Sequence, residues 1–213
     1  QDRTSTKSLW YYLTVIAMAK KKNMKVMLYS NGIGPLERKG NIKKTKKILD
    51  KVDLITLRDE RSYKTLHEIG IENKNVKVTA DPALDLDIAD EKLGKAILKN
   101  EGVPSDKKLL GVSVRKWQNL GGDFETQIAN ACDYAYKKYG YYTVFLPMQS
   151  SRDTAIMQNI KRKMKHESAI IKKRYSVEGM LSIIKCFDMC IGMRLHTLIY
   201  AAINSVPLIG LVY

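Results

Sequence analysis

Short apolar runs alternate with longer amphipathic stretches along most of this chain. Runs such as Leu109–Val114 and Phe187–Ile191 are mostly apolar and have the length of a buried parallel strand. In stretches such as Ser5–Lys22 and Phe124–Tyr139, apolar residues recur at the spacing of an amphipathic helix. Because strands and helices alternate, the pattern predicts an α/β fold with doubly wound parallel sheets.

The predicted elements follow one another with few interruptions. The predicted strands are Lys25–Tyr29, Asp53–Leu57, Asn75–Thr79, Leu109–Val114, Tyr142–Leu146, Ala169–Ile171, Phe187–Ile191 and Pro207–Leu211. The predicted helices are Ser5–Lys22, Asn41–Asp50, Glu60–Ile69, Glu91–Lys99, Phe124–Tyr139, Arg152–Lys165, Val177–Lys185 and Thr197–Asn204.

A change in composition near the middle of the chain predicts two domains. The first series of elements ends at Asp81-Pro82, and the segment from Ala83 to Lys108 is polar, with a break at Gly102-Val103-Pro104. We therefore predict an N-terminal Rossmann-like domain over residues 1–88 and a linker with one helix over residues 89–108. A second Rossmann-like domain is predicted over residues 109–213.

The turn at Gly192–His196 is the strongest candidate site for chemistry. Gly192 ends a predicted strand and the next helix follows closely, which places free backbone N–H groups at the carboxyl end of a parallel strand. Arg194 adds a forked cation and His196 a titratable imidazole. This combination favours an anion-binding site. Alternatively, the turn only closes the strand, with Arg194 capping helix carbonyls and His196 opening the next helix.

Two more residues follow predicted strands of the second domain. Arg115 comes directly after the strand Leu109–Val114, at the sheet edge where the turn with Arg194 lies, so two arginines could bind one anion bidentately. The alternative is an exposed cation on the rim. Gln149 follows the strand Tyr142–Leu146 and either contacts the hydroxyl groups of a ligand that accepts a transferred group or forms part of a loop.

Four stretches of the chain together carry a family resemblance. They are Gly192–His196 with the following Thr197–Ala202 and Val206–Tyr213, then Tyr29–Leu36, Ile55–Ser62 and Ala80–Ala83. Together they resemble the polysaccharide pyruvyl transferases. In that family an Arg-Leu-His turn helps to hold phosphoenolpyruvate, so the resemblance implies this role for Arg194, Leu195 and His196. With less specificity, it also matches the stretch that ends in Arg115.

The resemblance implies a fold and an activity. The fold would be two Rossmann-like domains facing a cleft, similar to the two-domain (GT-B-like) glycosyltransferases. The activity would transfer pyruvate from phosphoenolpyruvate, as co-substrate, onto sugar hydroxyls of a cell-wall or exopolysaccharide precursor as a ketal. Arg194 and His196 would be the catalytic residues, and no cofactor or metal is expected. Family members normally have residues before and after the matching region, so we expect both ends to be missing from this sequence.

The loop after the first strand supplies further candidates. Asn31 and Gly32 lie in this turn-rich loop, at the strand end where open α/β sheets place ligands. Arg38 follows the loop and could reach a phosphate. Arg58 reads more naturally as part of a local ion-pair cluster at a helix start. Asp81 is either a helix cap or an acceptor-side base.

Composition narrows the partners of the protein. The net charge is +15, and lysine-rich stretches such as Lys43–Lys47 have helical spacing, which is typical of solvated faces. Such a surface would attract anionic substrates or an anionic membrane leaflet. The family resemblance implies a lipid-linked saccharide acceptor, and with it we expect a cytoplasmic protein at the inner face of the membrane. No nucleic-acid-binding signature is present, and no His, Cys and Asp cluster has metal-ligand spacing. Two alternatives remain: a nucleotide-sugar-dependent glycosyltransferase and a non-catalytic polyanion-binding module.

Overall fold

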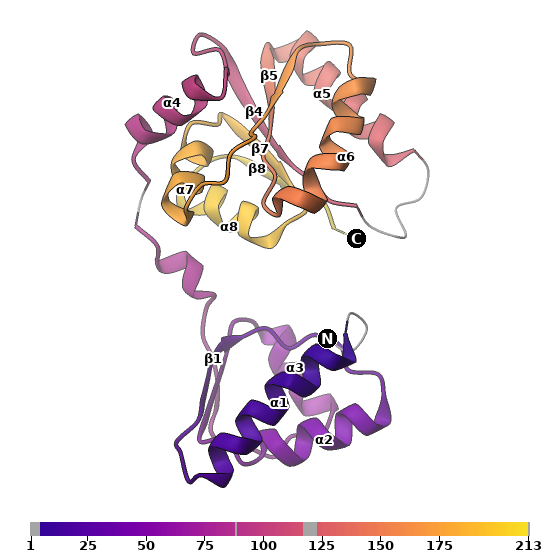
Figure 1. The fold of residues 1–213 in the computed structure, drawn as a ribbon, viewed down its shortest axis with the longest axis vertical. Helices are drawn as coiled ribbons and strands as arrows, with labels where there is room; N and C mark the ends of the chain where they lie inside the picture. Colours follow the sequence, from indigo (N-terminus) through magenta and orange to yellow (C-terminus); the bar gives the residue numbers. More distant parts are fainter. Residues whose placement is uncertain (1–4, 88, 117–122, 213) are drawn as a thin grey trace. The chain divides into compact units, whose positions relative to one another are not determined.

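The chain folds into two compact units. The structure is a computed structural model that describes residues 5–87, 89–116 and 123–212. It divides into unit 1, Gln1–Pro82, and unit 2, Ala83–Tyr213 (Figure 1). Residue 88, the predicted end of the first domain, lies outside the described residues. Helix α4 (Glu91–Asn100), which falls in the predicted linker, packs against α7 (Val177–Lys185) and so belongs to unit 2.

Unit 1 is a small parallel sheet packed against helices. Its strands are ordered β1-β2-β3 and span Met27–Asn31, Leu54–Leu57 and Val76–Val78. Its helices are α1 (Thr6–Lys21), α2 (Lys39–Leu49) and α3 (Glu60–Glu68), and a short 3₁₀ turn, Pro82–Asp85, follows β3. Ile55 and Leu57 of the central strand are fully buried, and Leu13 of α1 and Leu49 of α2 belong to the same core. The amphipathic pattern therefore closes a core of its own in this unit.

Unit 2 contains a five-stranded parallel sheet in the order β6-β5-β4-β7-β8. The strands are β4 (Lys108–Ser113), β5 (Tyr141–Phe145), β6 (Ser168–Ile170), β7 (Met189–Gly192) and β8 (Leu208–Gly210). From the central strand β4 the chain builds outward through β5 and β6, then returns to β4's other side with β7 and β8. The strand order thus reverses between β4 and β7. Open α/β sheets bind ligands at such a switch point.

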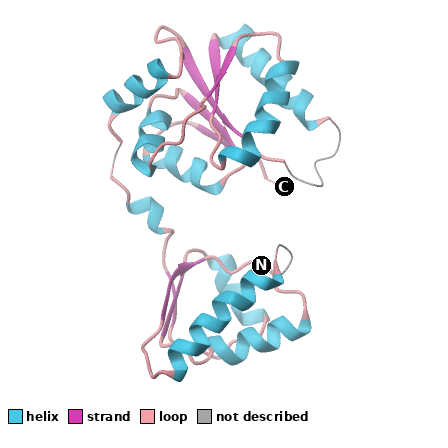
Figure 2. Cartoon of the chain, viewed as in Figure 1, coloured by secondary structure: helices cyan, strands magenta, loops and turns pink. Residues whose placement is uncertain are grey.

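Helices cover both faces of this sheet (Figures 1 and 2). One core joins the sheet to α4, α7 and α8 (Leu195–Ile203), and the other joins it to α5 (Phe124–Tyr139) and α6 (Ser150–Lys163). Val144 and Val112 on the inner strands are fully buried, one in each core. The predicted α/β fold with parallel sheets is confirmed.

The buried cysteines of unit 2 belong to these cores and are free thiols. Burial raises the pKa of the Cys190 thiol to about 12 and that of Cys132 to about 11. A thiol is nucleophilic only as the thiolate. These two cysteines are therefore packing residues near neutral pH.

Candidate functional site

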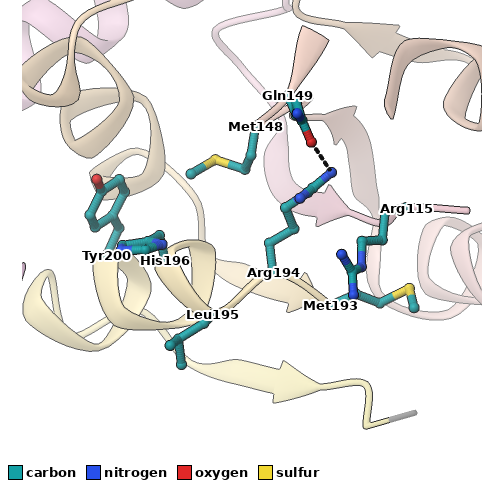
Figure 3. Close-up of a pocket in the computed structure, with 8 residues that line it drawn as sticks. All are labelled: Arg115, Met148, Gln149, Met193, Arg194, Leu195, His196 and Tyr200. Atoms are coloured by element: carbon teal, nitrogen blue, oxygen red, sulfur yellow. Dashed lines mark hydrogen bonds between the residues drawn. The ribbon is translucent and has the colours of Figure 1, made fainter. Parts of the chain in front are cut away.

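A pocket of about 490 Å³ opens in unit 2 at the carboxyl ends of the strands that flank the switch point (Figure 3). Residues predicted from the sequence make up much of its wall: Arg115, Gln149, Arg194, Leu195 and His196. Three further residues were not predicted: Met148, Met193 and Tyr200. We call this the arginine pocket. Loops after β4, β5 and β7, together with helix α8, form its wall, as expected where the strand order reverses.

Arg194 is held in this pocket by a buried carboxylate. Its Nε donates to one oxygen of Asp153 at 2.9 Å, and its Nη2 donates to the other oxygen. Nη2 also donates to Oε1 of Gln149 at 3.2 Å, the contact drawn in Figure 3. Among the described residues nothing bonds to Nη1, so this end of the guanidinium remains available to a ligand. Arg194 is thus a partly neutralised cation with a fixed direction.

Asp153 was missed by the sequence reasoning. It lies in the first turn of α6, and its side chain has no exposed surface. Besides the two bonds from Arg194, its carboxylate accepts the backbone N–H of Gln149 at 2.8 Å. A single carboxylate therefore fixes both the arginine and the loop after β5. The position of an acidic residue in a helix's first turn was a visible signal, but such residues also occur there for the helix dipole alone.

The two arginines are fixed by neighbouring strands. Arg115 follows β4, and Ser113 at the end of that strand pairs with Gly192 of β7. The carbonyl of Ser113 accepts the N–H of Met193 at 2.9 Å. Its hydroxyl lies 3.1 Å from the hydroxyl of the buried Thr197, which donates to it. These contacts lock the strand ends that carry Arg115 and Arg194 to one another.

His196 lies in the first turn of α8, which begins at Leu195 and thus earlier than the predicted start at Thr197. Arg194 is the N-cap residue, and no described side chain caps this helix. The first N–H groups of a helix have no acceptor within it, so those of Leu195 and His196 are available at the pocket wall. The His196 ring is exposed and meets the buried Tyr200 edge-on, with ring centroids 6.1 Å apart. An imidazole, a guanidinium and a helix N-terminus therefore converge.

A sequence model of the polysaccharide pyruvyl transferase family matches residues 1–213, the whole chain. The chain belongs to the polysaccharide pyruvyl transferase family. Its Arg-Leu-His turn lines the arginine pocket, and the role in holding phosphoenolpyruvate that the family resemblance implies for this turn stays a prediction. No curated protein matches the chain in sequence.

Solved structures share the fold of this pyruvyl transferase family member at low sequence identity. The S. aureus MnaA protein in a co-structure with UDP is 14% identical, with a TM-score of 0.65, covering 97% of this chain and 62% of that one. An Anabaena HepE protein in complex with UDP and glucose is 12% identical, with a TM-score of 0.64 and coverages of 93% and 56%. A family 9 glycosyl transferase from Veillonella parvula is 12% identical, with a TM-score of 0.53, covering 93% of this chain and 60% of that one. The chain spans about three fifths of these proteins, and its fold is GT-B-like.

The first-domain candidates of this pyruvyl transferase family member lie in unit 1. Asn31 ends β1, and its carbonyl accepts the N–H of Arg58 at 3.3 Å. Arg58 covers Gly32 so closely that a Cβ there would lie 2.6 Å from its Nε. Arg58 also pairs with Asp81 at 3.1 Å and with Asp59 at 3.5 Å. It is therefore part of a local ion-pair cluster, as its sequence context indicated.

Arg38 is engaged on the surface of unit 1. It is the N-cap residue of α2, and its Nη1 donates to the hydroxyl of Thr6 in α1 at 3.0 Å. Its predicted contact with a phosphate stays a prediction. Within the described part of the chain, no group of three or more His, Cys, Asp or Glu residues could hold a metal ion.

Proposed function

We propose that the chain transfers pyruvate from phosphoenolpyruvate onto two hydroxyls of a saccharide. A proton adds to the methylene carbon of phosphoenolpyruvate, one sugar hydroxyl attacks the adjacent carbon, and phosphate leaves as the second hydroxyl closes the ring. The products are a cyclic ketal of pyruvate and inorganic phosphate. Each hydroxyl gives up one proton. One of these protons replaces the proton taken up by the methylene carbon, which becomes a methyl group, and the other leaves on the phosphate.

The observation that carries this proposal is the pair of arginines at the switch point. Phosphoenolpyruvate has a carboxylate and a phosphate, and it therefore suits a site with two separate cations. Arg115 and Arg194 line one pocket, and Asp153 leaves Nη1 of Arg194 for the ligand. The bidentate contact also lowers the side-chain entropy that Arg194 would lose on binding. A preorganised cation stabilises the negative charge that builds up on departing phosphate.

His196 and the N-terminus of α8 complete the anion site. The N–H groups of Leu195 and His196 are placed to bind phosphate oxygens, as helix N-termini commonly do. The exposed imidazole either contacts the phosphate or gives the proton to the methylene carbon. Gln149, which is exposed and bonded to Arg194, lies where the acceptor hydroxyls would enter.

The acceptor is a saccharide, and the reaction belongs at the cytoplasmic face of a membrane. The net charge of +15 would bring the protein to an anionic leaflet that carries lipid-linked saccharides. No helix in the described residues is both long and apolar enough to cross a membrane.

Binding to the intact protein tests the proposed donor. We expect phosphoenolpyruvate to bind the wild type with heat measurable by calorimetry. Arg194→Lys should weaken that binding at least about tenfold, because a charge-assisted hydrogen bond contributes about 1.5–3 kcal/mol. The matched control is Arg162→Lys, because Arg162 is an exposed arginine near the end of α6. This variant should bind phosphoenolpyruvate as the wild type does.

The same titrations separate the competing functions. UDP-glucose is the second probe, because similar folds are found in proteins solved with UDP. Tight UDP-glucose binding without phosphoenolpyruvate binding would replace the proposal by a nucleotide-sugar-dependent glycosyltransferase. Affinity for both anions that tracks salt alone and ignores Arg194 would indicate a polyanion-binding module.

A further inference from the structure

A second pocket, of about 480 Å³, adjoins the arginine pocket in unit 2. The two share Met148, Gln149 and Tyr200 as wall residues, so they lie side by side along the carboxyl edge of the sheet. Its remaining wall comes from the segment after β6 and from α7, including Val177 and Met180. We call it the basic pocket, for the residues described next.

The wall of the basic pocket carries consecutive cations. Lys172, Lys173 and Arg174 lie in the loop after β6, all are exposed, and all line the pocket. Among the described residues that line this pocket, none is acidic. The lysine-rich stretches of α2 and α6 cover helix surfaces, whereas these three residues border a hollow. The charge of this wall therefore favours an anionic group.

The loop that carries these cations is held in place by Glu101, at the end of α4. Its carboxylate accepts the backbone N–H of Lys172 at 2.9 Å and of Lys173 at 3.1 Å, and the hydroxyl of Tyr175 at 2.8 Å. Burial acts to raise the pKa of Glu101, but these hydrogen bonds outweigh it and lower that pKa. Because Glu101 binds the backbone of the loop, the loop is fixed in place while Lys172 and Lys173 remain exposed at the pocket wall.

The rest of the basic pocket is apolar and aromatic. Met148, Met180 and Tyr200 line it, and burial together with the bond to Glu101 raises the pKa of Tyr175 to about 12. Tyr175 therefore remains a neutral ring near neutral pH. Tyrosine rings and methionine side chains pack well against the faces of sugar rings and other flat apolar surfaces. The wall thus combines cations for an anion with apolar groups for the moiety attached to it.

We propose that the basic pocket is a second anion site, which binds the diphosphate group attached to the acceptor saccharide. The assignment rests on the proposed function, which places the donor in the arginine pocket. Since the pockets share a wall, a ligand whose diphosphate lies against Lys172 and Lys173 extends its sugar toward Gln149 and the donor. The acceptor class is then a saccharide diphosphate ester and not a free sugar.

Pyrophosphate binding in the presence of saturating phosphoenolpyruvate tests this site on the intact protein. We expect the wild type to bind pyrophosphate while phosphoenolpyruvate is bound. Lys172→Ala with Lys173→Ala should weaken pyrophosphate binding at least tenfold and change phosphoenolpyruvate affinity less than twofold. The matched control is Lys107→Ala with Lys108→Ala. It removes the same charge at the amino-terminal end of strand β4, away from the pockets at the carboxyl ends of the strands, and should leave both affinities unchanged.

A second variant tests whether the loop must be preorganised. Glu101→Gln keeps the size of the side chain but weakens its hold on the two backbone N–H groups, and it should reduce pyrophosphate affinity with both lysines in place. UDP and geranyl diphosphate then distinguish the two sources of a diphosphate. UDP represents a nucleotide-linked diphosphate, and geranyl diphosphate represents a lipid-linked one. The compound that binds more tightly than pyrophosphate, and whose binding also depends on Lys172 and Lys173, identifies the group attached to the diphosphate.

Two results would overturn the assignment. One is direct competition between pyrophosphate and phosphoenolpyruvate, which would make the two pockets one site. The other is a Lys172 and Lys173 variant that binds pyrophosphate as the Lys107 and Lys108 control does. Failure of the proposed function looks different: phosphoenolpyruvate would not bind, while pyrophosphate binding would still depend on the loop.

Discussion

Asp153 contributes a fully buried carboxylate to the arginine pocket, and its partners are Arg194 and the backbone N–H of Gln149. Taking a carboxylate out of water costs several kcal/mol unless hydrogen bonds and an opposite charge offset the cost. Here the bidentate contact with Arg194 provides both. The pair is thus a positioning device, in which the buried residue directs the one that faces the ligand.

Asp153→Asn should disturb the contact with Arg194 while the volume of the side chain stays nearly the same. The amide group presents N–H where the guanidinium needs an acceptor, so Arg194 loses one of its fixed bonds. We expect phosphoenolpyruvate affinity to fall about tenfold, with a loss of stability of about 3 kcal/mol from the broken buried pair. Calorimetry and urea unfolding measure the two effects. Because Asp153 acts through Arg194, the double variant with Arg194→Lys should bind no worse than Arg194→Lys alone, whereas additive losses would contradict this positioning role.

Arg115 and Arg194 line one pocket from two strands, so their effects on one ligand should be coupled. We expect Arg115→Ala to weaken phosphoenolpyruvate binding about tenfold, and the combined variant with Arg194→Lys to lose less than the sum of the two free energies. A double-mutant cycle on the dissociation constants measures the coupling. Strict additivity, or unchanged binding in Arg115→Ala, would make Arg115 a rim cation.

Among the elements, helix α4 belongs to unit 2 because it packs against α7. Gly94 of α4 lies so close to α7 that a Cβ would stand 2.0 Å from the carbonyl oxygen of Ser182. Such an approach is open only to glycine. A polar composition suggested a linker here, but the apolar residues Ile97 and Leu98 are buried in the core of unit 2. The close packing also anchors Glu101, which binds the backbone of the loop after β6.

Gly94→Ala should therefore destabilise unit 2. Alanine favours an isolated helix by about 1 kcal/mol over glycine, but the collision is with backbone and cannot be relieved by a rotamer change. Overpacking of this kind costs about 1–3 kcal/mol. Urea unfolding followed by circular dichroism measures the difference. Gly40→Ala in α2 is the control, because a Cβ there meets nothing within 4 Å, and it should leave stability unchanged or slightly raised. Equal behaviour of both variants would contradict the close packing.

Elements were predictable because periodicity is a local property of the sequence. Every predicted strand and helix corresponds to one in the structure, with shifted ends such as the earlier start of α8 at Leu195. The turn Gly192–His196 could be singled out as a candidate for the same reason, since glycine, arginine and histidine are neighbours in the chain, and four of its residues line the arginine pocket. Its binding of an anion stays a prediction. The pairing of Asp153 with Arg194 joins two distant segments, and no periodicity encodes it. The same holds for Glu101 and the loop after β6.

At the scale of the whole molecule, each unit has its own hydrophobic core. The described residues that line the two proposed ligand pockets belong to unit 2. A ligand stabilises the cooperative unit that binds it, and only that unit if the two unfold separately. Phosphoenolpyruvate should therefore protect unit 2 and leave unit 1 unaffected. A perturbation confined to unit 1 gives the reciprocal test.

Asp53 provides that perturbation, because it ties α1 and the segment before β1 to the start of β2. Its carboxylate accepts Nζ of Lys20 at 2.7 Å and the N–H of Val26 at 2.8 Å. These bonds lower its pKa from 3.8 to about 2. A lowered pKa in the folded state means that the carboxylate stabilises unit 1 above about pH 4 and that this stabilisation is lost as the pH falls toward 2.

Asp53→Asn should accordingly weaken unit 1 near neutral pH, and the difference from the wild type should shrink as the pH falls below about 4. Hydrogen exchange followed by mass spectrometry reads the two units separately, through the central strands β2 and β4. We expect Asp53→Asn to speed exchange in β2 without changing β4, and phosphoenolpyruvate to slow exchange in β4 without changing β2. Changes that appear in both strands under either perturbation would mean that the units unfold as one. A pH-independent difference at β2 would remove the linkage to Asp53, since only a titrating carboxylate loses its partners in that range.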